Sequence, residues 1–102
     1  MQQRDYIERL IEQIAGFIAR IAGAARNGDP QEAEQALDAA WGALGLRWKD
    51  AMRLDDVTLR MLLGGKAALA ADLFDAQAAL EDTRSNAKLA DELRSRATVL
   101  RG

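Results

Sequence analysis

The sequence contains neither cysteine nor histidine. The absence of cysteine excludes disulfide bonds, thiolate nucleophiles and zinc sites built on sulfur. The absence of histidine removes the usual general base near neutral pH and the commonest metal ligand. We therefore predict no catalytic residues, no metal site and no cofactor, and we expect that the protein is not an enzyme.

Proline and aromatic residues are also scarce, and long apolar runs are missing. There is a single proline, and aromatic residues make up 5% of the 102 residues. No segment approaches the roughly 20 apolar residues that span a membrane, and residues 1–6 lack the pattern of a signal peptide. Hydrophobic residues make up 49% and charged residues 29%, which argues against a disordered chain. We expect a soluble, cytoplasmic protein with no membrane partner.

The net charge of −2 argues against a domain that binds nucleic acid over its whole surface. The charge is unevenly distributed, because acidic residues dominate residues 61–83 and basic residues dominate residues 84–101. Two neighbouring helices of opposite charge would attract each other modestly. The alternative is that the basic C-terminal helix binds nucleic acid or an acidic partner. Its basic residues are Arg84, Lys88, Arg94, Arg96 and Arg101.

Large apolar residues recur at helical spacing between residues 6 and 25. At about 100° per residue they form one continuous arc, the a, d and e positions of three heptads. The members of this arc are Ile7, Leu10, Ile11, Ile14, Phe17, Ile18 and Ile21. The pattern predicts one long amphipathic helix from about residue 3 to residue 26. An arc so long and wide needs more than one partner element.

Clear stop and start signals follow this helix. Asn27 and Gly28 both tolerate the left-handed conformation that ends a helix. Asp29 is a good N-cap residue, Pro30 suits a first turn, and Glu32 completes a capping box. The short connection predicts that the first two helices form an antiparallel hairpin.

The remaining helices are shorter, and they predict an all-α fold. Residues 46–54 are irregular, and we expect a loop with one helical turn there. Asp55 is predicted to cap a short helix that turns Leu62 inward, and Thr83 or Ser85 to cap the last helix. The sequence thus predicts a single helical domain, residues 1–102, of two antiparallel helical hairpins with a short connecting helix. The predicted later helices span about residues 30–44, 56–63, 66–82 and 86–100.

The first hairpin resembles a tetratricopeptide repeat. The resemblance lies in the turn and in the second helix, where small and large residues occupy the positions of that repeat. The matching residues are Gly28, Asp29, Ala33, Leu37 and Ala40. It implies a tetratricopeptide-like helical hairpin in the first half of the chain.

The whole chain also resembles a family of small, all-helical bacterial proteins of unknown function. The resemblance is carried by Gln-Arg-Asp-Tyr-Ile at residues 3–7 and by Arg-Leu-Ile-Glu-Gln at residues 9–13. It implies that the first helix is a constant feature of such proteins, and it implies no activity.

Our functional hypothesis is a non-enzymatic protein–protein interaction or scaffold module that self-associates through the first helix, with a dimer favoured. A large exposed apolar patch is unusual in a monomer. Either the later helices or a second protomer must therefore cover Ile11, Ala15, Ile18 and Ala22. An unidentified protein partner remains an alternative. Trp48 is a further candidate contact, although it would equally plug the end of the bundle.

Overall fold

The computed structural model describes residues 2–102, with side chains from residue 5 onward, and every element in this part of the chain is helical. The all-α prediction is confirmed. The helices are α1 (Gln2–Arg26), α2 (Pro30–Ala43), α3 (Trp48–Arg53), α4 (Asp56–Leu63), the 3₁₀ turn η1 (Gly64–Lys66), α5 (Ala67–Thr83) and α6 (Ala87–Arg101).

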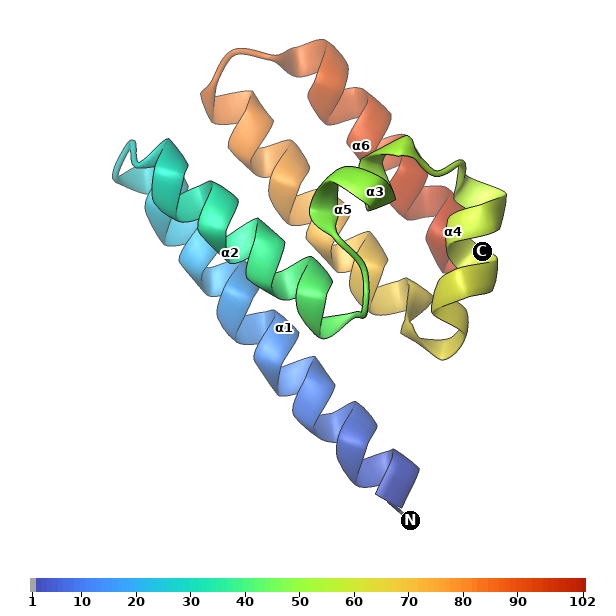
Figure 1. Ribbon diagram of the computed structural model, residues 1–102. Coiled ribbons are helices and arrows are strands. Elements are labelled where there is room, and N and C mark those ends of the chain that lie inside the picture. The colour runs from blue at the N-terminus through green and yellow to red at the C-terminus, as the bar shows by residue number, and fades with distance from the viewer. Residues whose placement is uncertain (1) are drawn as a thin grey trace.

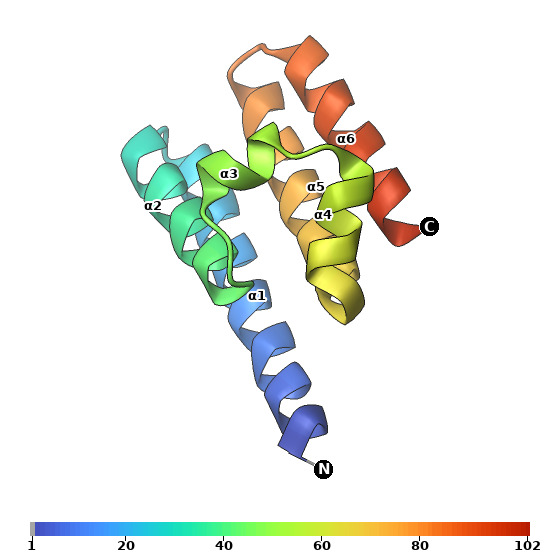
Figure 2. The same ribbon diagram turned by 45° about the vertical axis from the view of Figure 1, so that its right-hand side comes forward.

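The helices are arranged as two pairs (Figure 1). α2 lies along the C-terminal part of α1, and α6 lies along α5. α5 also packs against α1, so it is the element that joins the two pairs. Figure 2 shows α3 crossing from the α1/α2 pair toward the α5/α6 pair, where α4 packs against α5 and α6.

The predicted turn between α1 and α2 is present. Gly28 adopts a φ of 65°, and the Asp29 Oδ1 accepts a hydrogen bond from the Glu32 N–H at 3.1 Å. The capping box is only half formed, however. The Glu32 carboxylate accepts from Arg20 of α1 at 2.6 Å instead of returning to Asp29, so it ties α2 to α1.

Three local predictions are corrected. Residues 46–54 contain a six-residue helix, α3, and not merely a single turn in a loop. Leu62 is 59% exposed, because Leu59 and Leu63, four residues apart, occupy the inward face of α4. Asn86 takes the N-cap position of α6 without a side-chain hydrogen bond.

The residues that we expected to cap α6 have other conformations. Ser85 lies in the turn with a φ of 61°, and the Thr83 hydroxyl donates to the Leu80 carbonyl within α5 at 2.6 Å. The start of α6 is therefore set by the turn and by its packing on α5.

The centre of the core is an aromatic contact between the two helix pairs. Trp41 of α2 meets Phe74 of α5 edge-on, with the ring centroids 5.2 Å apart. On α6, the guanidinium carbon of Arg96 lies 4.7 Å from the centroid of the same Phe74 ring. Trp41 and Phe74 are both fully buried, so these contacts are formed away from water.

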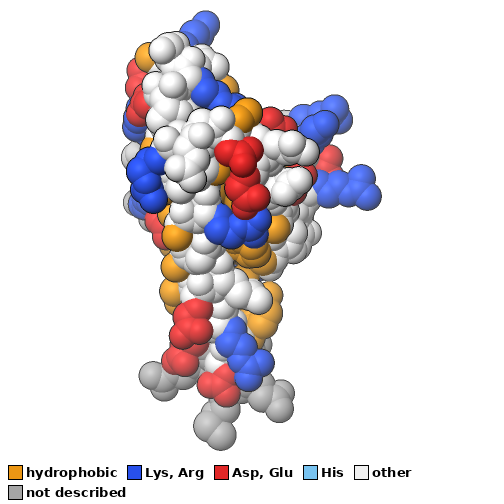
Figure 3. All heavy atoms as spheres, turned by 90° about the vertical axis from the view of Figure 1, so that its left-hand side faces the viewer, with side chains coloured by type: hydrophobic (Ala, Val, Ile, Leu, Met, Phe, Trp, Pro, Cys, Tyr) orange, Lys and Arg blue, Asp and Glu red, His pale blue; other side chains and the backbone are white. Residues whose placement is uncertain are grey.

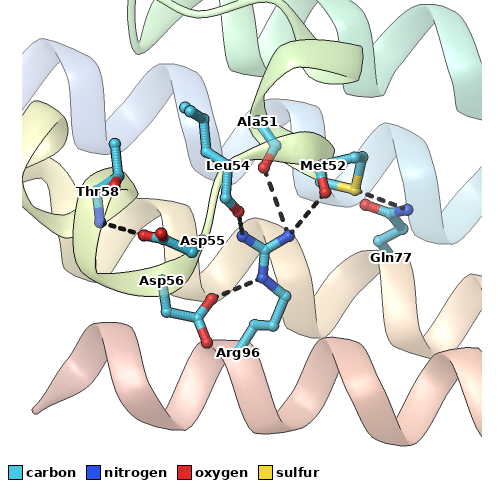
Figure 4. Close-up of polar contacts among 8 residues, drawn as sticks. All are labelled: Ala51, Met52, Leu54, Asp55, Asp56, Thr58, Gln77 and Arg96. Carbon is cyan, nitrogen blue, oxygen red and sulfur yellow. Dashed lines mark hydrogen bonds and ion pairs between the residues drawn. The ribbon is translucent and has the colours of Figure 1, made fainter.

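Arg96 also fixes the segment that connects the two pairs (Figure 4). Its Nε donates to the Asp56 Oδ1 at 2.6 Å. Its Nη1 and Nη2 donate to the carbonyl oxygens of Ala51, Met52 and Leu54. The last carbonyls of a helix have no partner within it, so one side chain satisfies the end of α3 and also pairs with Asp56, the first residue of α4.

We predict that Arg96→Met lowers the free energy of unfolding by about 2–3 kcal/mol, because it leaves Asp56 and the α3 carbonyls without their donor. Methionine keeps the apolar stem against Phe74. Urea unfolding measures the change.

The control is Arg94→Met on the same helix, which removes the same charge. Arg94 pairs with Asp82 and Asp91 at the surface and is 45% exposed. Exposed pairs contribute about 0–1 kcal/mol. Equal losses in the two variants would contradict the central role of Arg96.

A second prediction concerns pH. The hydrogen bond from the Thr58 backbone N–H, and then that from its hydroxyl, hold the pKa of Asp55 below the ordinary 3.8. A carboxylate whose pKa is lowered by folding stabilises the folded state above its unfolded pKa, and this contribution is lost as pH falls through the folded pKa.

We therefore expect Asp55→Asn to be less stable than the natural protein at pH 7, with a difference that shrinks as the pH falls below 3.8. Thermal unfolding monitored by circular dichroism measures it. Asp38→Asn, on the exposed side of α2 and at no helix cap, is the control. A pH-independent difference for Asp55→Asn would contradict the assignment.

Candidate interaction surface

α1 is much longer than the helix that packs along it. It has 25 residues and α2 has 14. At 1.5 Å per residue these lengths are about 37 and 21 Å. The N-terminal turns of α1 therefore project beyond the body of the molecule, which measures 42 × 25 × 19 Å overall (Figures 1 and 3).

This projection carries exposed apolar side chains. Tyr6 is 52% exposed, Ile7 36% and Ile11 47%. Hydrophobic side chains flank the projection in Figure 3, beside acidic and basic ones. Large apolar residues gathered on one short segment are typical of a surface that another molecule covers.

The structure divides the α1 arc into two lines. Leu10, Ile14 and Ile21 are 1–2% exposed and belong to the core, so they are not available to a partner. Phe17 is half-buried beside them. The sequence could not separate the two lines, because both fall within one continuous arc.

The second line faces outward along α1, and we call it the outer stripe. It consists of Ile7, Ile11, Ala15, Ile18 and Ala22, of which all but Ile18 are exposed. Within the described residues, this surface is the one that best fits the predicted self-association.

The C-terminal part of the outer stripe forms one wall of a groove between α1 and α5, which we call the α1–α5 groove. It encloses about 350 Å³. α1 contributes Ile18, Ala22 and Ala25 to it, α5 contributes Ala76 and Ala79, and Arg26 lies at its end. Thus α5 partly covers Ile18, while Ile11 and Ala15 remain exposed.

Trp48 does not belong to this surface. It lies in α3, is half-buried and packs against the hydrophobic core. Its indole Nε1 is buried and donates no hydrogen bond to a described residue. Trp48 therefore fits the alternative in which it closes the core.

A second exposed apolar patch, on α4, was not predicted from the sequence. Val57 is 69% exposed and Met61 79%, next to the exposed Leu62. Their i, i+4 spacing on α4 was the available signal. This patch lies on a different element from the outer stripe.

The basic residues of α6 are largely paired with carboxylates. Arg101 contacts Asp72 and Asp75 of α5, each at 2.7 Å, and these two hydrogen bonds raise its pKa. Arg94 pairs with Asp82, so the predicted attraction between the acidic and basic helices is confirmed. With Arg96 bound to Asp56 and Arg84 to Glu81, Lys88 is what remains of the predicted basic strip.

No protein-family model, curated protein or solved structure matches this chain. The resemblances to the tetratricopeptide repeat and to the small bacterial helical family therefore stay predictions. Among residues 2–102, no helix is long and apolar enough to cross a membrane. Nor do the described side chains include a group of three acidic residues placed to hold a metal ion.

Proposed function

We propose that this protein is a non-enzymatic interaction or scaffold module that self-associates through α1, with a dimer as the favoured assembly. The observation that carries the proposal is the exposure of Tyr6, Ile7 and Ile11 on a helix that projects from the body. The absence of cysteine and histidine supports a role without catalysis. We keep a cytoplasmic location as part of the proposal.

The free energies of burial and of association favour an interface larger than the projecting turns alone. Covering the exposed part of one isoleucine contributes about 1 kcal/mol. Two copies would therefore gain about 4 kcal/mol from Ile7 and Ile11, whereas association costs about 4–15 kcal/mol of lost translational and rotational freedom. A stable dimer must also cover neighbouring surface.

We expect light scattering at about 50 micromolar protein, well above a micromolar dissociation constant, to give twice the chain mass of 11.1 kDa. Ile11→Glu should give the monomer mass, because each copy would bury an unpaired charge in the interface. Thermal unfolding monitored by circular dichroism should show that the variant stays folded, since Ile11 is exposed within the chain.

The matched control is Val57→Glu, which places the same charge on the exposed patch of α4. It should keep the dimer mass. A monomer mass for the natural protein under these conditions would refute the proposed self-association, and equal effects of both substitutions would refute its location on α1.

The alternative function is binding of nucleic acid or an acidic partner through α6. The structure disfavours it, because Arg94, Arg96 and Arg101 already form ion pairs within the chain. Phosphate binding requires basic groups that are free to replace counterions. We expect no mobility shift of a mixed-sequence oligonucleotide at low salt. A shift that disappears with added salt and with Lys88→Glu would instead favour the alternative.

A further inference from the structure

We infer that the partner of α1 is α1 of a second copy, aligned antiparallel, with the projecting turns of each copy seated in the α1–α5 groove of the other. This inference rests on the proposed self-association and adds its direction, its register and the surface that receives the projection. Side-chain size, the position of the groove and charge each support it.

Side-chain size favours antiparallel pairing. Along the outer stripe Ile11, Ala15, Ile18 and Ala22 follow one another at spacings of four, three and four residues, the seam of a two-stranded coiled coil. Antiparallel alignment places Ile11 opposite Ala22 of the second copy, and Ala15 opposite Ile18. Each large side chain then meets a small one, which allows close packing. Parallel alignment would oppose isoleucine to isoleucine and alanine to alanine.

The groove lies where this alignment places Ile7. Ile7 and Ala25 are separated by 18 residues in α1, about five turns at 3.6 residues per turn, so they share one flank of the helix. Ala25 lines the α1–α5 groove. When two antiparallel helices are related by a two-fold axis, equivalent sides of the two helices lie next to each other. Ile7 of one copy therefore reaches Ala76 and Ala79 of the other copy. This groove supplies the additional contact surface that a stable dimer needs beyond the projecting turns.

Charge favours the same arrangement on the other flank. Glu8 and Arg26 are also 18 residues apart and so also lie on one flank, about five turns apart. Residues 5–12 carry three acidic side chains, Asp5, Glu8 and Glu12, against the single basic Arg9, whereas Arg26 lines the groove. Among the described side chains, Arg26 forms no ion pair with another residue. Antiparallel pairing brings Glu8 beside Arg26 of the second copy at both ends, whereas parallel pairing keeps them five turns apart.

Cysteine cross-linking tests the register, since the chain has no cysteine of its own. Ile11→Cys and Ala22→Cys each add one thiol at an exposed position. When the two full-length variants are mixed, equilibrated and then oxidised, we expect a disulfide-linked dimer with one copy of each. Neither variant alone should form it. Val57→Cys mixed with Ala22→Cys is the matched control and should stay unlinked.

Charge exchange tests the same register without a covalent bond. Glu8→Arg alone and Arg26→Glu alone should each raise the dissociation constant by about tenfold, because an attractive pair becomes repulsive at both ends of the dimer. The double variant should return to within about threefold of the natural protein. A double variant as weak as the singles would overturn the register.

The cross-linking outcomes separate this inference from the proposed function. A dimer mass together with self-linking of Ile11→Cys, or with no linking in the mixture, would overturn the antiparallel arrangement and leave self-association standing. A monomer mass would overturn both. Specific linking of the mixed pair supports both.

Discussion

The arrangement of the two helix pairs depends on the contacts that the Phe74 ring makes. Its ring lies against Trp41 from α2 and beneath the guanidinium of Arg96 from α6. Because Arg96 also binds Asp56 and the end of α3, the crossing segment is fixed at the same point. The position of α5 beside α1 follows from this contact, and the α1–α5 groove exists because α5 lies there.

The sequence was informative wherever a structural choice depends on neighbouring residues. Asp29 and Asp55 cap their helices as predicted, because a cap involves residues only three apart. Helical spacing alone also brings Leu37 and Trp41, four residues apart, to one face of α2, and both are fully buried. Glycine after a helix marked real chain reversals, as the φ of 65° at Gly28 shows.

The sequence was uninformative wherever the choice depends on distant partners. Arg96 reads as part of a basic helix, yet its carboxylate partner is 40 residues away. The α1 arc could not be divided into buried and exposed lines until the lengths of α2 and α5 were known. Ile14 and Ile11 belong to the same pattern, and the packing of α2 and α5 against α1 leaves Ile14 buried and Ile11 exposed. Leu62 was wrongly predicted to face inward, because α4 is too short for the spacing of its apolar residues to define one buried face.

The projection of α1 has a consequence for how its first turns are ordered. Residues 5–9 are all exposed, so in a single copy their helical form depends on local hydrogen bonds and propensity. Short helical segments without tertiary contacts are marginal in water. In the proposed dimer a second copy would bury these turns, and part of the binding free energy would be spent on ordering them. Ordering of this kind would make the proposed dimer weaker than its contact area alone suggests.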